Sequence, residues 1–501
     1  MAVQVDHLPY RLGRFSTRSV VFLVMLVLIV AQGVFAYSQQ YIHGLVVTGL
    51  RDIGTMGGAA WGLYISFDVY FVGVSFAGIT MAALIRLFRL EHLRPVSRLA
   101  EVLTIVALIL AAFSVLPDVG QPVRALVNLF RYARPQSPFF GTFTLVVAGY
   151  LFASLVYLYL DLRRDAALLA QHGGRLQGFY RLWAAGYRDT PAERARHERV
   201  TFWLAIAIVP LLITAHSTLG FVFGIQAGRP GWFSTLQAPG FVIMAGISGI
   251  GLLLVITAIM RKILGQSSRF NEDVFRWLGA LLFALILTYL YFMVVEVLTT
   301  LYAGHHHEVR ISFSLIVGDF APLFWITVSG LILAAVGLLL PRLAPAFRAR
   351  ITALSPWVAS GSGIAAVVLG ILLLAQASGV AAPFDQAWHA RLWWLFGGLL
   401  FLLVLSLLPR LAQTWVSATT TAGILVNVAA IAKRLLIVVP SQTHGNLLPY
   451  STGWYVPTWV EISIIVGLFA LGTLMYILFF TIFPVTEVHA EEGGEQWAVE
   501  P

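Results

Sequence analysis

The chain has 501 residues, of which 59% are hydrophobic and only 11% are charged, and its mean hydropathy is +0.85. A soluble domain carries about 25% charged residues, so the composition excludes a soluble protein and predicts an integral membrane protein. There are no cysteines, which excludes disulfides, thiol catalysis and protein-ligated iron–sulfur clusters in this chain. The net charge is +9. In a membrane protein the basic residues act as topology determinants, so this charge does not indicate nucleic-acid binding.

Apolar stretches long enough to cross a bilayer as helices, about 20 residues each, recur twelve times. They lie at 19–36, 60–85, 99–117, 141–160, 201–225, 239–260, 274–302, 320–340, 356–379, 391–408, 419–440 and 459–483. This pattern predicts an all-α polytopic membrane protein with about twelve transmembrane helices. No small-residue cleavage site follows the first stretch, so we expect it to be retained as a span rather than removed as a signal peptide.

The basic residues predict the orientation of the spans. With the N-terminus inside, 23 of the 32 Lys and Arg residues fall on the inner side and seven on the outer side, as the positive-inside rule requires. The largest inner loop, about 161–200, is polar and carries eight of the arginines. The tail from Glu487 is acidic and is expected to be disordered. We therefore predict a multi-pass membrane protein with both termini in the cytoplasm.

Eight ionisable residues fall within the spans or at their ends: Asp68, Glu101, Asp118, His216, Glu296, Lys433, Arg434 and Glu461. Such groups are costly in hydrocarbon and usually face a protein interior or a water-filled cavity. The topology places all of them in the outer half of the membrane except Glu101, which lies at the inner end. Contact with lipid headgroups is an equally good interpretation for Glu101 and Glu461. A structural ion pair is the alternative to a functional role for Lys433 and Arg434, with Glu461 as their expected partner.

Histidines limit the cofactors that the chain could hold. His216 is the only one of twelve histidines deep in a predicted span, and a membrane b-type haem usually needs a pair of axial imidazoles. The cluster His305–His307 lies in an outer loop, where three adjacent rings point in divergent directions, so a solvated loop is favoured over a metal site. The sequence therefore predicts no haem and no metal site.

Several segments together resemble the NrfD/polysulfide-reductase membrane-subunit family, with the hydrogenase-associated HybB-like branch as the most similar. They are 60–68 (AWGLYISFD) with Gly73 and the pair Ala77-Gly78, 118–122 (DVGQP), 214–220 (TAHSTLG), Glu296, 433–435 (KRL) and 455–461 (YVPTWVE). Their order and spacing over 60–484 carry the resemblance, because no single segment is specific. Gln121 stands where the family typically has Arg, so a role of that Arg cannot be transferred. The region 356–408 resembles an extra hairpin relative to ten-helix members.

The resemblance implies a fold and a function. Members of the family are cofactor-free membrane anchors that exchange electrons with quinones, and their core resembles two four-helix bundles. It implies menaquinone or ubiquinone as bound substrate near the outer face. It also implies a ferredoxin-like iron–sulfur subunit as partner, linked to a hydrogenase or molybdopterin catalytic subunit or to a multihaem cytochrome. The expected organisation is a cytoplasmic N-terminus (1–18), an eight-helix quinone-binding core (19–340), additional helices including the hairpin (341–484) and a cytoplasmic tail (485–501).

Quinone chemistry moves two protons with two electrons, so it needs titratable groups in a partly dry cleft. We assign Asp118, His216 and Gln121 as candidates for binding the quinone head. We assign Asp68, Glu296 and Glu101 as candidates for a proton path. The chain is not expected to be catalytic without its partners.

Other classes of function remain open at this point. A secondary transporter suits twelve spans, but the chain shows no convincing inverted repeat and its polar residues do not gather at the midplane. A proton-translocating subunit of a redox complex would need a polar chain reaching the inner side. A purely structural anchor would keep quinone turnover when Asp118 is replaced.

Overall fold

The computed structural model describes residues 17–50, 59–132, 134, 136, 143–171, 176–265, 270–377, 386–443 and 455–486. Within these ranges the regular secondary structure is helical, and no strand occurs. The expected cytoplasmic N-terminus up to residue 16 and the acidic tail from Glu487 lie outside the described residues.

Among the described residues, twelve helical segments are long and apolar enough to cross a membrane, which confirms the predicted number of spans. They are Thr17–His43, Leu63–Leu87, Glu91–Asp118, Thr144–Leu169, Pro191–Gly224, Gln237–Leu264, Glu272–Ala303, Ala321–Arg342, Pro345–Gln376, Arg391–Leu411, Trp415–Thr443 and Trp459–Ile482. The fourth segment continues about nine residues beyond the predicted end at 160, and the ninth begins about eleven residues before the predicted start at 356. In both, polar helical turns extend the apolar stretch.

The chain folds into two compact units. The first consists of residues up to Gly249, Ile259–Asn271 and the residues from Ile437 onward. The second consists of Ile250–Ala258 and Glu272–Leu436. The boundaries of these units do not coincide with the expected division at residue 340, because the eleventh span packs with the second unit and the twelfth with the first.

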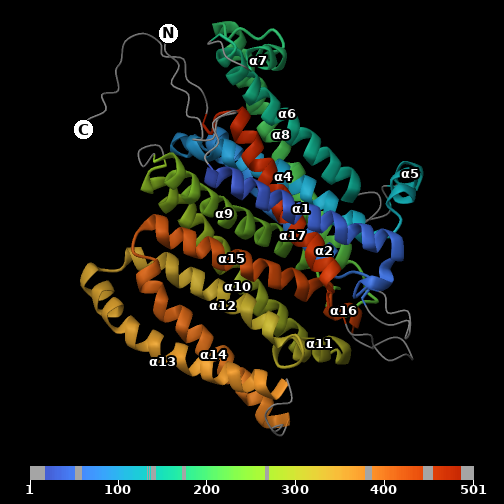
Figure 1. The fold of residues 1–501 in the computed structure, drawn as a ribbon, viewed down its shortest axis with the longest axis vertical. Helices are drawn as coiled ribbons and strands as arrows, with labels where there is room; N and C mark the ends of the chain where they lie inside the picture. Colours follow the sequence, from blue (N-terminus) through green and yellow to red (C-terminus); the bar gives the residue numbers. More distant parts are fainter. Residues whose placement is uncertain are drawn as a thin grey trace. The chain divides into compact units, whose positions relative to one another are not determined.

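In the first unit, α1 (Thr17–His43) and α17 (Trp459–Ile482) run side by side although they lie at opposite ends of the sequence (Figure 1). Gly33 and Gly467 face each other, and a Cβ added to Gly33 would lie 3.1 Å from the Cα of Gly467. In lipid, no hydrophobic effect drives helices together, so spanning helices associate by close packing. The two glycines allow that close approach.

In the first unit, α4 (Arg94–Asp118) packs against the second span, α6 (Thr144–Leu169) and α17. The second span consists of α2 (Leu63–Val74) and α3 (Phe76–Leu87), and α6 also packs on α8 (Pro191–Gly224). Their shared core contains Ala82, Leu108, Tyr150, Tyr157, Ala205, Ile208, Leu212 and Ala215. Most of α9 (Gln237–Leu264) also belongs to this unit. Shorter elements are η1 (Leu45–Val47), η2 (Glu91–Leu93), α5 (Pro122–Tyr132), α7 (Gln177–Ala184) and α16 (Pro440–Thr443).

In the second unit, α15 (Trp415–Val438) is the helix against which three others pack. Gly330 of α12 (Ala321–Leu339) lies against Ala429, and Gly279 of α10 (Glu272–Ala303) lies against Thr419. Gly251, in the part of α9 that belongs to this unit, lies against Val426. Parts of α9, α10 and α12 thus pack against α15, which comes from the C-terminal third of the chain.

The remaining helices of the second unit include the predicted hairpin. Its arms are α13 (Pro345–Ala377) and α14 (Gln386–Leu411), and Gly370 of α13 lies against the Phe396 ring. Leucines of α12 and α14 form a small core with Ala418 of α15. The unit also contains α11 (His306–Ile316), which begins within the histidine cluster, and η4 (Leu340–Arg342).

Candidate functional site

The second span is interrupted at Ser75, between α2 and α3. The Ser75 hydroxyl donates to the Val72 carbonyl at 2.6 Å, a local bond that competes with the bonds of the helix itself. Thr104 Oγ1 of α4 and the Tyr150 hydroxyl of α6 donate to the Ser75 carbonyl at 2.7 and 2.8 Å. The Ser75 N–H still donates to the Phe71 carbonyl at 3.1 Å, while Thr104 Oγ1 accepts from the Gly78 N–H at 2.9 Å, so side chains supply part of the backbone bonding at the interruption.

His216 of α8 reaches the same break. Its Nε2 lies 2.9 Å from the Val72 carbonyl oxygen, and its Nδ1 lies 2.7 Å from the Leu212 carbonyl oxygen one turn earlier in α8. The residue is 1% exposed, and the rings of Phe76 and Tyr150 pack around the imidazole. The predicted buried histidine is thus a contact between α8 and the broken second span.

Asp118 lies at the end of α4, at what we call the Asp118 end of the first unit. It is 5% exposed. Gln40 of α1 donates to the Pro117 carbonyl at 2.7 Å and accepts from the Tyr64 hydroxyl at 2.6 Å, and Ser114 donates to the Tyr64 carbonyl at 2.6 Å. These bonds from α1 and α2 fix the last turn of α4 and therefore the position of the Asp118 carboxyl group.

Asp68 and Gln121 lie around Asp118 but differ in exposure. Asp68 is buried on α2, one turn after Tyr64, and its carboxyl group lies within electrostatic reach of Asp118. Gln121 is exposed, follows Gly120, and accepts the backbone N–H of Ala125 at the start of α5. Gly120 has a φ of 73°, a conformation that glycine adopts readily and that turns the chain out of α4.

The sequence predicted that Asp118 and His216 bind one quinone head, but the structure separates the two side chains. His216 is bonded to Val72, which lies three residues before Ser75, and Ser75 is bonded to Thr104 of α4. At about 1.5 Å per residue, Asp118 lies roughly 21 Å farther along α4 than Thr104. Val72 lies about 4.5 Å nearer the Asp118 end than Ser75 does, which leaves roughly 16 Å between the levels of His216 and Asp118, too far for one quinone head to contact both.

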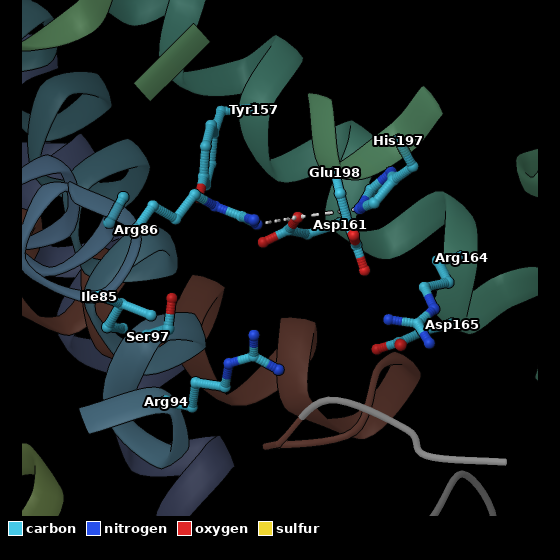
Figure 2. A pocket seen from close by; sticks show the side chains of 11 residues that line it. Ile85, Arg86, Arg94, Ser97, Tyr157, Asp161, Arg164, Asp165, His197 and Glu198 are labelled. Carbon is cyan, nitrogen blue, oxygen red and sulfur yellow. Dashed lines mark hydrogen bonds and ion pairs between the residues drawn. The ribbon is translucent and has the colours of Figure 1, made fainter. Parts of the chain in front are cut away.

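The opposite end of the first unit, which we call the Arg94 end, contains a cavity of about 50 Å³ between α3, α4, α6 and α8. Asp161 lies 3.2 Å from Arg86 and 3.7 Å from His197, and the Arg86 guanidinium also donates to the Tyr157 hydroxyl. Figure 2 shows these side chains pointing toward one another, with Glu198 beside them. A cavity of this size with polar walls can hold a few water molecules.

Three further charged side chains lie at or beside this cavity. Glu101 is buried and accepts a hydrogen bond from Ser97 at 2.7 Å, one turn earlier in α4. Arg98 of α4 forms an ion pair with Asp165 of α6, and both side chains are 2% exposed. The predicted inner-end residue Glu101 is therefore part of a larger polar cluster rather than a helix-end residue in contact with lipid headgroups.

The sequence prediction missed the α6 members of this cluster. It ended the fourth span at 160 and so left Asp161 and Asp165 in a loop. The signal was present, because Tyr157, Asp161 and Asp165 follow one another at intervals of four and must share one face of a helix.

Glu461 has a structural role in the first unit. Its carboxylate accepts from the backbone N–H of Gly49 and from the Tyr455 hydroxyl, both at 2.7 Å, and from the N–H of Thr458 at 3.0 Å. Burial, and then the charge of Glu461, raise the pKa of Tyr455, so this phenol remains a donor. Glu461 thus caps α17 and ties it to the segment after α1.

The second unit gives Lys433 another partner than the one expected. Its Nζ lies 3.7 Å from the Glu296 carboxylate, in a pair between α15 and α10. The sequence prediction grouped Lys433 and Arg434 with Glu461. Within the second unit, Lys433 pairs with Glu296, and the pairing with Glu461 stays a prediction. Glu296 is about one-third exposed. Arg434 is buried next to Lys433, and Tyr289 lies within electrostatic reach of both.

Comparisons with known proteins show which family and which proteins this chain resembles. Residues 52–382 match the family described as Polysulphide reductase, NrfD. A protein of Halobacterium salinarum, named as the membrane component of a dimethyl sulfoxide reductase, is 32% identical over 63% of this chain and 68% of its own length. A component of the selenate reductase of Mesobacillus selenatarsenatis is 26% identical over 62% and 72%. An Hdr-like menaquinol oxidoreductase integral membrane subunit of Archaeoglobus fulgidus is 22% identical over 57% and 61%.

Proposed function

This chain belongs to the NrfD family, and on that premise we propose that it is the quinone-interacting membrane subunit of a respiratory oxidoreductase complex. The similar proteins are named as subunits of dimethyl sulfoxide and selenate reductases and of a menaquinol oxidoreductase, which supports menaquinone or ubiquinone as substrate. The same names favour an iron–sulfur subunit and a molybdopterin catalytic subunit as partners over a hydrogenase.

The observation that carries the proposal is the buried carboxyl group of Asp118 at the end of a spanning helix. The bonds of Gln40 and Tyr64 hold that end in place, and Asp68 supplies a second carboxyl group nearby. A carboxyl group, an amide and a phenol are suitable partners for a quinone head, because they can donate and accept hydrogen bonds. In this proposal Asp118 and Gln121 bind the head, and Asp118 and Asp68 exchange its protons.

The partner is proposed to dock at the Asp118 end, on the outer face of the bacterial inner membrane, with both termini in the cytoplasm. The basic residues support this orientation, since most of them fall on the side of the Arg94 end. The first eight spans, 19–340, are proposed as the quinone-binding core, completed by α15 and α17.

Replacement of Asp118 tests the proposal. In membranes containing the whole complex, Asp118→Asn should lower quinone-linked turnover by about 100-fold, the scale of acid–base catalysis. Reduction of a soluble dye by the catalytic partner should be unchanged. Asp319→Asn is the matched control, because Asp319 is an exposed aspartate between α11 and α12. Unchanged quinone turnover in Asp118→Asn would refute the assignment and favour a structural anchor.

The Arg94 end favours a second function, which is proton transfer across the first unit. Polar groups follow one another from Asp118 and Asp68 through the broken second span to Glu101, Asp161 and His197. A proton-translocating subunit needs such a series on both sides of the midplane. In proteoliposomes containing the complex, Asp161→Asn should lower the number of protons moved per electron pair, whereas Asp273→Asn, at an exposed site, should not. Equal proton yields in the two variants would exclude this function.

A further inference from the structure

The His216 ring is placed between two backbone carbonyl groups. Nδ1 faces the Leu212 oxygen at 2.7 Å and Nε2 faces the Val72 oxygen at 2.9 Å. A carbonyl oxygen can only accept a hydrogen bond, so each ring nitrogen must carry a hydrogen to bond its neighbour. A neutral imidazole has one N–H, and its other nitrogen would direct a lone pair at a carbonyl oxygen. The imidazolium ion has both N–H groups and satisfies both contacts.

The surroundings increase the cost of losing either bond. The imidazole is 1% exposed, so water does not replace a missing donor, and a buried polar group without a partner is destabilising. Val72 lies at the end of α2, next to the break at Ser75, where its oxygen also accepts from the Ser75 hydroxyl. The bond from Nε2 thus ties α8 to the interrupted span.

We propose that His216 stores a proton at the level of the break, holding α8 to α2 as the imidazolium ion and loosening that contact when it releases the proton. This inference rests on the proposed proton transfer across the first unit. On release, the Nε2–H bond breaks, its electron pair stays on the nitrogen, and the proton passes by way of water to Asp68 when that residue is a carboxylate. The positive charge of the ring is lost and the negative charge of Asp68 is neutralised, so charge balances.

The titratable groups around His216 fit this role. On α2, Asp68 lies one turn before Val72 on the same helix face, and it leads on to Asp118. On α6, the Tyr150 ring lies 6.4 Å from the imidazole, but its hydroxyl donates to Ser75. On α4, Glu101 lies about one turn beyond Thr104, toward the Arg94 end. His216 therefore lies between the carboxyl group of Asp68 on one side of the break and that of Glu101 on the other.

The protonation state can be measured directly. The wild-type complex, labelled with ¹⁵N-histidine and examined by solid-state NMR at pH 7, should show a buried histidine with both ring nitrogens protonated. His216→Gln should remove that signal and His43→Gln, at an exposed histidine, should retain it. Ser75→Ala gives an independent assignment, because it should shift the signal of the histidine that shares the Val72 oxygen. An unprotonated ring nitrogen in the assigned signal would overturn the proposal.

Turnover tests the release step. A glutamine amide offers two N–H donors and does not titrate, so His216→Gln should keep the complex assembled and its dye-linked activity, while quinone-linked turnover falls at least tenfold. His43→Gln should leave both activities unchanged. Full quinone-linked turnover in His216→Gln would overturn the role in proton transfer. Full quinone-linked turnover in Asp118→Asn would instead overturn the proposed quinone site. The NMR measurement of the His216 protonation state does not depend on that result.

Discussion

The buried ion pair between Arg98 and Asp165 allows a quantitative stability prediction. Each side chain is 2% exposed, and the Arg98 guanidinium also lies 3.4 and 3.3 Å from the carbonyl oxygens of Pro484 and Thr486. Asp165→Asn removes the negative charge and keeps the shape. Removing one partner of a buried ion pair costs about 3–5 kcal/mol. Because the two carbonyl groups still accept from Arg98, we expect the lower value, about 3 kcal/mol.

The assay is thermal unfolding of the purified complex in detergent, with Asp273→Asn as the matched control. Asp273 forms a pair with Arg276 at 2.6 Å, but these side chains are 57% and 61% exposed, so its loss should cost less than about 1 kcal/mol. Equal losses of stability in the two variants would refute the argument, since burial is the only intended difference between the pairs.

A double replacement separates charge from packing. Arg98→Met with Asp165→Leu removes both charges, and buried pairs replaced in this way often regain the stability lost in the single variant. If the double variant is as unstable as Asp165→Asn, the bonds from Arg98 to Pro484 and Thr486 hold the end of α17, and the ion pair does not.

Two further predictions concern packing and pH. A Cβ at Gly78 would lie 2.7 Å from the Ala100 carbonyl oxygen and closer still to Thr104 Oγ1, so Gly78→Ala should lower the free energy of unfolding by about 1–3 kcal/mol. Gly397→Ala is the control, because its site has open space and the variant should not be destabilised. Equal losses of stability in the two variants would contradict the close packing at Gly78. Burial, and then the charge of Asp189, raise the pKa of Tyr187 to about 12. The folded protein therefore holds this proton more tightly than the unfolded chain, and the stability is present below pH 10 and lost as the pH rises through 12. Tyr187→Phe should lose less stability than the wild type across that window, and identical pH curves would contradict the shift.

The spans were predictable from the sequence because lipid imposes a simple rule. Each helix must satisfy its own backbone bonds and present apolar side chains over about 20 residues, and that pattern is visible without a partner helix. The predicted limits were wrong where polar turns continue a helix past the apolar stretch, as in α6. There Tyr157, Asp161 and Asp165 form a polar face of the helix. Their low hydropathy led to the prediction of a loop from residue 161.

Burial of the ionisable residues was also predictable, but their partners were not. Asp68, Glu101, Asp118 and His216 are all buried, as the cost of charge in hydrocarbon predicts. The partner of His216 is the backbone of a broken helix 144 positions away, and a backbone carbonyl leaves no mark in the sequence. The interruption itself has only a weak signal, a serine in an apolar run.

The spacing of polar groups along α4 limits how the first unit could combine a quinone site with a path for protons. Glu101 and Thr104 lie within one turn of each other, whereas Asp118 lies roughly 21 Å beyond Thr104, too far for a direct proton transfer. Asp68, on the neighbouring helix, lies between these levels. If the unit transfers protons as proposed, the section around Asp68 is the one where the helices must move or admit water. A contact between α8 and α2 that loosens when His216 releases its proton would let the helices separate, or water enter, next to Asp68.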